Sequence, residues 1–312
     1  MLKRPLILTA LLAQFLFYSA SPLVSVASAK DSTLSSLYSY AASEAAGSDR
    51  EAQNQSGISG GFISLSIPYT TVGNVNVETL DWCENLVAKT FNILPEDQVA
   101  AVHNLTLSFD PDSRRGLAGG NTLILRCTGM GEDELVAVLL HEMGHVTDTG
   151  LLQNSDFTPV EKTSFDDRGT PVYTGDPSAE FYSISWENNS SFTSLETGFI
   201  SGYAMTSPFE DFADTYAAYI LHGPLFRFYA ALNTDLKTKY EFMEEIVFDG
   251  VEFDLDNEKL PPIREANVRV YDITLKDFSL ESFWMLSGVL GFKILESEDC
   301  WVPTRQPLED SS

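Results

Sequence analysis

The chain has 312 residues, and its hydrophobic content of 44% is ordinary for a globular protein with one large domain or two modest ones. Its 45 acidic side chains against 19 basic ones leave a formal charge of −26. A surface this negative repels nucleic acid and anionic lipid, which excludes both as expected partners.

The first 29 residues have the pattern of a secretory signal peptide. Lys3 and Arg4 precede the apolar run PLILTALLAQFLFY, and small residues follow up to Ala29. An uncleaved membrane anchor is the alternative interpretation. Cleavage after Ala29 predicts a secreted protein, extracellular or held in the cell envelope, without stable membrane insertion. The protein is expected to be a monomer.

An exported chain reaches an oxidising compartment, in which cysteines can pair. The chain has three cysteines, so at least one thiol stays unpaired. Cys83 and Cys127 flank a compact segment and are the preferred pair over any that involves Cys300. The sequence alone does not establish this connectivity.

Order is expected to begin at residue 62. Residues 30–61 are rich in Ser, Ala and Gly and predict a flexible, low-complexity leader, with a propeptide as a further interpretation. Residues 77–92 carry apolar side chains at helical spacing. Two strand candidates follow at 105–109 and 121–127, separated by the turn-rich stretch DPDSRRGLAGG.

The stretch GEDELVAVLLHEMGHVTDTG, residues 131–150, predicts the next helix. Glu132 and Asp133 suit its positive end, and Gly150 suits its exit. Residues 151–200 are polar with few periodic runs, which predicts an insertion or a long loop between two lobes.

Further helices are predicted in the second half of the chain. Residues 207–223 begin with a good N-cap followed by proline and end at Gly-Pro, and residues 225–247 are helical again. The stretch VRVYDITL at 268–275 has a strand-like pattern. The apolar residues 282–292 are too few to span a bilayer and predict a core segment.

The motif HEMGH at 141–145 indicates a zinc site. Residues one helical turn apart share a face, so His141 and His145 can bind one ion. Glu142 is placed to take a proton from a water molecule activated by the metal. A structural trio with satisfied hydrogen bonds is the alternative interpretation, because buried polar groups need partners.

A catalytic zinc needs a third protein ligand and an open position. The metzincin pattern requires Gly and His where this chain has Asp148 and Leu151, which excludes that class. A deuterolysin-like aspartate is missing from GTPVY at 169–173, although the Gly-Thr pair is present. The remaining candidate is a glutamate on a later helix.

That later helix contains Glu210 and Asp214 one turn apart. Glu210 can bind the metal while Asp214 accepts the spare N–H of a ligand histidine. Ser207 and Glu210 also form a capping-box pattern, so helix capping is the competing role for this glutamate. Tyr203, seven residues before Glu210, could donate a hydrogen bond to the oxyanion of the reaction, or it could simply pack.

HEMGH, Tyr203 and the stretch from Glu210 to Asp214 resemble the catalytic domain of the anthrax lethal factor family of secreted zinc peptidases. The resemblance implies His141, His145 and Glu210 as zinc ligands, Glu142 as general base and Tyr203 as an assisting residue. It further implies that the strand at 121–126 pairs with extended substrate. Asp214 departs from lethal factor, which has glutamate there.

These observations predict an α+β, zincin-like, two-lobed metallopeptidase with a small mixed sheet and an HExxH helix. Residues 62–249 form the catalytic domain, and residues 250–312 complete its lobe. The expected function is that of a secreted, Zn²⁺-dependent endopeptidase of the gluzincin type, with peptides or proteins as substrates. The alternative is an exported binding or surface protein that keeps the zincin fold without turnover.

Overall fold

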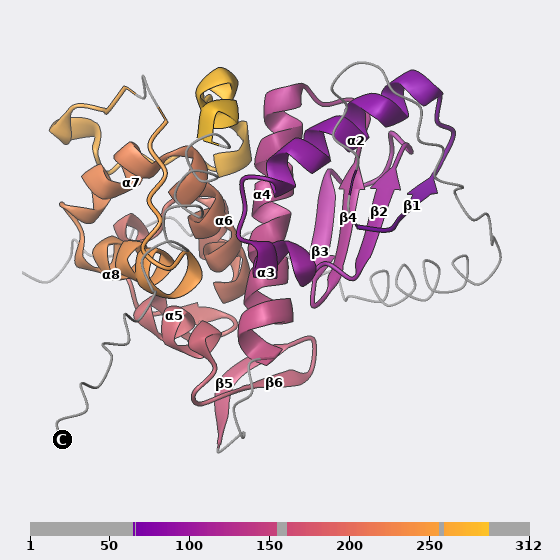
Figure 1. Cartoon of the computed structure of the whole chain (residues 1–312). Helices are drawn as coiled ribbons and strands as arrows, with labels where there is room; N and C mark the ends of the chain where they lie inside the picture. Colours follow the sequence, from indigo (N-terminus) through magenta and orange to yellow (C-terminus); the bar gives the residue numbers. More distant parts are fainter. Residues whose placement is uncertain (1–64, 66, 155–160, 256–258, 287–312) are drawn as a thin grey trace, which may run out of the picture. The chain divides into compact units, whose positions relative to one another are not determined.

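A computed structural model describes residues 65, 67–154, 161–255 and 259–286 (Figure 1). The expected signal peptide, the leader at 30–61 and Cys300 lie outside these residues. The strands are β1 Tyr69–Val72, β2 Asn104–Ser108, β3 Gly116–Gly119, β4 Thr122–Arg126, β5 Lys162–Asp167, β6 Thr170–Tyr173, β7 Trp186–Asn188 and β8 Ser191–Phe192. The longer helices are α2 Val77–Phe91, α3 Glu96–Ala100, α4 Glu132–Val146, α5 Pro177–Ser185, α6 Pro208–Leu221, α7 Gly223–Ala230 and α8 Thr234–Phe242.

The described chain is α+β with small sheets, as the sequence predicts. The largest sheet has the order β1-β2-β4-β3, in which β1, β2 and β4 are parallel and β3 is antiparallel to β4. Alternate residues of β2 and β4 are buried because successive side chains of a strand point to opposite faces. A disulfide joins Cys83 of α2 to Cys127 at the end of β4, which confirms the preferred pair.

Helix α4 is the central element of the fold. It contacts α2, β3 and β4 on one side and α6 on another, and Figure 1 shows it running between the sheet and the helices of the second half. Its residues from Leu135 onward are buried, as expected of a helix surrounded by other elements. A turn of π-helix, Thr147–Leu151, continues it past Gly150.

Two predictions from the sequence are wrong. Residues 151–200 are not a long loop, because they contain the β5-β6 hairpin, α5 and the β7-β8 pair. Their large side chains, including those of Phe181 and Trp186, are buried, but they come from elements too short to show a period. Residues 268–275 are not a strand, because they have no neighbouring strand in the described chain and end in a 3₁₀ turn at Ile273–Leu275.

The other predicted helices are present. Ser207 caps α6, and residues 225–247 form α7, α8 and a π-helical turn at Met243–Val247. In the segment predicted to be core, Phe283 is buried and Met285 is exposed, whereas its residues after 286 are outside the description. Within the described residues, no helix combines the length and the apolar composition that crossing a bilayer requires.

Candidate metal centre

A close contact between α4 and α6 brings the two halves of the candidate site together. Gly144 faces Ala213 so closely that a methyl group at position 144 would lie 2.7 Å from the Ala213 Cα. Only glycine permits this backbone approach. The contact explains how Glu210, far along the chain from His145, comes to face the histidine pair.

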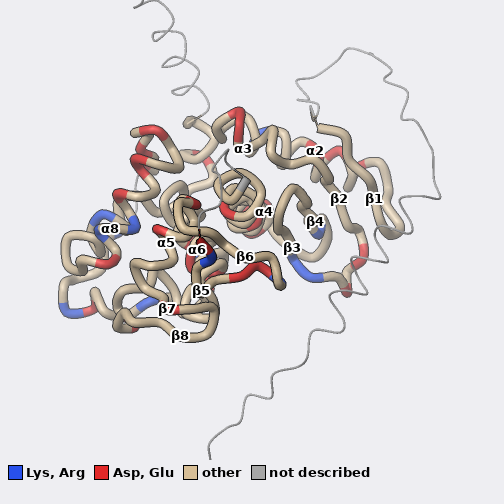
Figure 2. The backbone as a smooth tube through the Cα atoms, turned by 90° about the horizontal axis from the view of Figure 1, so that it is seen from below, with Lys and Arg blue, Asp and Glu red and all other residues tan. Residues whose placement is uncertain are grey.

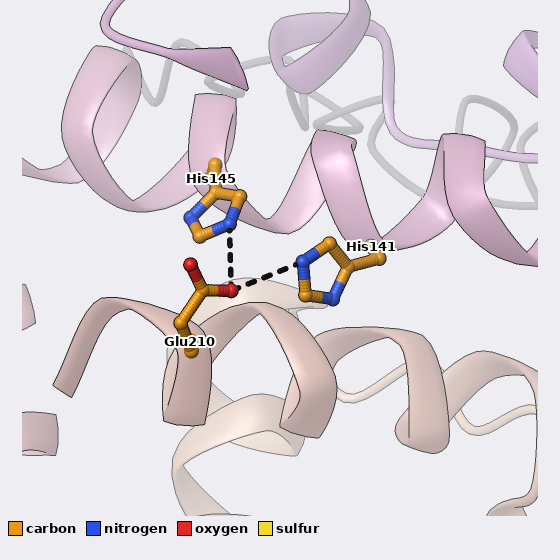
Figure 3. A group of neighbouring side chains, drawn as sticks. All are labelled: His141, His145 and Glu210. Carbon is orange, nitrogen blue, oxygen red and sulfur yellow. Dashed lines mark ion pairs between the residues drawn. The ribbon is translucent and has the colours of Figure 1, made fainter. Parts of the chain in front are cut away.

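His141, His145 and Glu210 converge on one point (Figure 3). The Nε2 atoms of His141 and His145 lie 3.2 and 3.3 Å from the Glu210 Oε2. The potential ligand atoms of the three residues all lie within 4.8 Å of one another. Both imidazoles come from α4 and the carboxylate comes from α6, so the group spans the helix contact.

These three residues fit a zinc ion. The Glu210 Oε2 is buried and has no hydrogen-bond partner in the described chain, despite the two nearby nitrogens. Ligand atoms about 2.0–2.1 Å from a tetrahedral zinc lie roughly 3.3 Å apart, which agrees with the two distances to Glu210. A two-histidine, one-glutamate set also has the nitrogen and oxygen donors that zinc prefers. The unpaired buried oxygen is explained if a cation lies between the three atoms.

The charges of the group favour cation binding. Burial disfavours a charged His141, but the adjacent carboxylates of Asp214 and Glu210 raise its pKa well above the ordinary value. Burial likewise opposes a charged Glu210, yet His145 and His141 bring the pKa of this carboxyl far below its usual range. The buried carboxylates therefore attract positive charge to this point, where a metal ion would take the place of the imidazole protons.

A hydrogen-bond chain behind the histidines orients one of them. The His141 Nδ1 lies 2.7 Å from the Asp214 Oδ1, and Asp214 is fully buried. The Ser201 hydroxyl donates to the other oxygen of Asp214 and accepts a hydrogen bond from the Ala204 amide at 2.9 Å. Such partners fix the tautomer and the ring orientation of a metal-binding histidine. Ser201 was not predicted from the sequence, because no motif marks it.

The Glu142 side chain lies beside β3, at the edge of the sheet. Its side chain is buried against Gly116 of β3, where an added methyl group would lie 2.2 Å from the Glu142 Oε1. Burial raises the pKa of this carboxyl, although His141 and His145 oppose the rise. A raised pKa suits a carboxylate that has to accept a proton during a reaction. Gly116 was not predicted from the sequence either, because it lies in a short glycine-rich strand.

The predicted substrate strand needs correction. Residues 121–126 correspond to β4, which has β2 on one side and β3 on the other. Its backbone hydrogen bonds are therefore used within the sheet, and it cannot pair with a peptide. The free edge beside Glu142 belongs to β3, a short strand rich in glycine that periodicity does not reveal.

Tyr203 lies beside His141. Its ring centroid is 6.0 Å from that of His141, and its amide donates to the carbonyl of Tyr271. Burial and the nearby carboxylate of Glu210 raise the pKa of the phenol, so it stays protonated and able to donate a hydrogen bond. Its 3₁₀ turn, Tyr203–Thr206, leads directly into α6.

Glu210 makes only one of the two hydrogen bonds of a capping box. Its amide donates to the Ser207 hydroxyl at 3.2 Å, as in a capping box. Its carboxylate faces the histidines, and in the described chain it makes no return bond to the Ser207 amide. GTPVY lies elsewhere, in the β5-β6 hairpin, and does not belong to the metal-binding group.

Asp148 is a buried acid one turn beyond the histidines. Its Oδ2 accepts a hydrogen bond from the Tyr182 hydroxyl at 2.6 Å, whereas its buried Oδ1 has no partner in the described chain. Burial raises the pKa of this carboxyl from 3.8 to about 7, although the Tyr182 bond opposes the rise. The folded protein therefore prefers Asp148 protonated.

We expect the Asp148→Asn variant to be increasingly stabilised, relative to the native chain, as pH rises. Well below pH 4 the carboxyl is neutral in both states, and between about pH 4 and 7 the unfolded chain ionises while the folded chain stays mostly protonated. The native free energy of unfolding thus loses up to about 4 kcal/mol in this window, a loss that asparagine avoids. Urea unfolding from pH 4.5 to 8.5 measures the difference. An unchanging difference, or the same trend for the exposed Asp112→Asn, would contradict the prediction.

The part of the chain that contains the candidate metal centre matches a known protein family. Residues 130–283 match the model of a protein family described as "Putative zinc-binding metallo-peptidase". The match supports a metallopeptidase. No curated protein and no solved structure gives a significant match to the chain. The matched residues include His141, Glu142, His145, Tyr203 and Glu210, and they leave out the four-stranded sheet.

Proposed function

We propose that this metallopeptidase is a secreted, zinc-dependent endopeptidase of the gluzincin type with a two-lobed, zincin-like architecture. The observation that carries the proposal is the convergence of the His141, His145 and Glu210 side chains around an oxygen without a hydrogen-bond partner. Asp214 orients His141 from behind, as a gluzincin requires. The resemblance of these positions to the lethal factor family supports the same class.

Each neighbouring residue has a role in peptide hydrolysis. When bound, zinc would polarise the scissile carbonyl and lower the pKa of the attacking water molecule, which makes that water a stronger nucleophile once its proton is removed. Glu142 accepts the proton of the attacking water and passes it to the leaving amine. Tyr203 donates a hydrogen bond to the oxygen that becomes negative in the transition state. The edge of β3 beside Glu142 can receive an extended substrate by strand addition.

Secretion is supported by two independent features. The N-terminal pattern is that of a cleaved signal peptide. The Cys83–Cys127 disulfide suits an oxidising compartment outside the cytoplasm. Comparing the N-terminal residue of the mature protein with Lys30 tests the expected cleavage site and shows whether residues 30–61 are removed as well.

Metal analysis combined with a cleavage assay tests the function. We expect about one zinc per folded chain and cleavage of casein or a peptide library that a chelator abolishes and added zinc restores. A folded protein without zinc would overturn the metal assignment. A zinc-loaded protein that cleaves nothing would instead favour the binding protein without turnover.

A further inference from the structure

The segment of residues 270–274 carries an exposed aromatic side chain close to the candidate active site. Tyr271 is 68% exposed. Its ring centroid lies 6.3 Å from that of Tyr203, whose own ring centroid lies 6.0 Å from that of His141. Two ring contacts therefore connect a candidate metal ligand with a large side chain that faces solvent.

Backbone hydrogen bonds hold Tyr271 beside the turn that carries Tyr203. The Tyr203 amide donates to the carbonyl of Tyr271 at 2.6 Å. The Gly202 amide donates to the carbonyl of Val270 at 2.9 Å. The Tyr271 ring also packs on the bare backbone of Gly202, where an added methyl group would lie 2.7 Å from Cδ2 of the ring. The same segment therefore determines the positions of both tyrosines.

An ion pair connects this segment with the start of β3. Asp272 pairs with Arg115, which also donates to the Thr274 hydroxyl at 3.1 Å. Arg115 directly precedes Gly116, the glycine against which Glu142 packs. The exposed ring therefore lies near the start of the strand edge that is expected to receive substrate.

The direction of β3 determines which part of a substrate reaches Tyr271. A peptide that adds to this edge is expected to pair antiparallel, which is the more stable arrangement. Its chain then runs from Gly119 toward Gly116, with the scissile bond beside Glu142. The residues after the scissile bond continue past the start of β3 toward Tyr271. Because successive side chains of an extended chain point to opposite sides, one of the first two can contact the ring.

A large apolar side chain suits this position. It would cover the exposed ring, and aromatic pairs favour the edge-to-face arrangement that Tyr203 and Tyr271 already form. An acidic side chain is repelled, because Asp272 and Glu134 share the single positive charge of Arg115. Figure 2 shows further acidic residues spread over many elements of the described chain. A basic side chain gains only a weak cation–π contact at an exposed ring.

We propose that Tyr271 determines substrate specificity by selecting a large apolar side chain, preferably an aromatic one, at the first or second position after the scissile bond. The proposal rests on the peptidase function proposed above. Tyr271 covers one face of the substrate side chain and takes no part in breaking the peptide bond. Such a contact is present before and during the reaction, so it acts on KM more than on kcat.

Cleavage of matched peptides tests this selection. A peptide that the native enzyme cleaves is prepared with Phe, Ala, Lys or Glu at each of the two positions after the cleaved bond. At one of these positions, we expect the kcat/KM of the Phe peptide to exceed that of the Ala peptide about tenfold, mainly through KM. In Tyr271→Ala this ratio should fall to about two. Tyr271→Phe should keep the native ratio, because the ring makes the contact.

The matched control is Leu232→Ala. Leu232 is another exposed large apolar residue, and it lies between α7 and α8. This variant should keep the native ratio. A Tyr271→Ala variant that keeps the native ratio at both positions would overturn the proposal. A native enzyme that prefers the Lys or Glu peptide to the Phe peptide at both positions would overturn it as well.

A binding assay separates this proposal from the peptidase function. Dansyl-labelled Ala-Ala-Ala-Phe-Phe-Ala, and the same peptide with Ala for both Phe, are titrated into zinc-loaded Glu142→Gln protein, and fluorescence anisotropy is measured. We expect the Phe peptide to bind about tenfold more tightly, and the double variant with Tyr271→Ala to lose most of this difference.

The two proposals can fail independently in these assays. If the native protein cleaves no peptide but the difference in binding depends on Tyr271, the peptidase function fails and Tyr271 is still a residue that recognises apolar peptides. Equal affinity of the two peptides, or no binding of either, would overturn the role of Tyr271 even in a protein that cleaves peptides.

Discussion

Replacing Glu142 with glutamine should lower kcat for peptide hydrolysis by about 10²–10⁴-fold, the usual contribution of a general base, while zinc content stays unchanged. The amide keeps the shape of the side chain against Gly116 but cannot accept the proton of the attacking water. Single-turnover cleavage of a fluorogenic peptide, together with metal analysis of the same preparation, measures both quantities.

The matched control for this variant is Glu132→Gln, three turns earlier on the same helix. Glu132 accepts a hydrogen bond from Trp82, which the glutamine oxygen can also accept. We expect its kcat to stay near the native value. Full activity in Glu142→Gln would remove Glu142 as general base, and loss of zinc from that variant would assign it a role in binding the metal.

Replacing Lys239 with methionine should lower the free energy of unfolding by about 3–5 kcal/mol, because it leaves the buried carboxylate of Asp211 without its partner charge. Lys239 and Asp211 are fully buried, and the ammonium lies 2.7 and 2.9 Å from the two oxygens of Asp211. It also donates to the carbonyl of Gly198. Asp211 follows Glu210, so the pair anchors the turn of α6 that presents the third candidate ligand.

Urea unfolding measures this effect, with Lys237→Met as the matched control on the same helix. Lys237 pairs with Glu241 on the surface, where an ion pair contributes about 0.5 kcal/mol or less. Adding Asp211→Leu to Lys239→Met should recover part of the lost stability, because the second change removes the stranded charge. If Lys239→Met lowers the free energy of unfolding no more than Lys237→Met does, the buried pair of Lys239 and Asp211 does not stabilise the fold as expected.

The helices of the candidate site could be predicted because their signals are local. Apolar residues at a period of 3.6, the proline after Ser207 and the acidic first turn before HEMGH each act within a few residues. The same spacing puts His141 and His145 on one face of α4. Cys83 and Cys127 could be named as a pair only because they flank a compact segment.

The short elements could not be predicted, because their patterns depend on partners elsewhere in the chain. β3 has four residues, including two glycines, and becomes a strand by pairing with β4. Residues 268–275 alternate like a strand but have no partner strand in the described chain. The assignment of substrate pairing to β4 was wrong for the same reason, since edge position is a property of the sheet.

Local sequence patterns identified the functional groups of the candidate site: two histidines one turn apart around a glutamate, with a tyrosine, a second glutamate and an aspartate later in the chain. Whether Glu210 caps its helix or faces the histidines depended on the packing of α4 against α6 through Gly144 and Ala213. Tertiary packing also forms the hydrogen-bond chain from Ser201 through Asp214 to His141. It likewise places the Glu142 side chain against Gly116. Such contacts join residues far apart in the chain, and local sequence patterns carry no information about them.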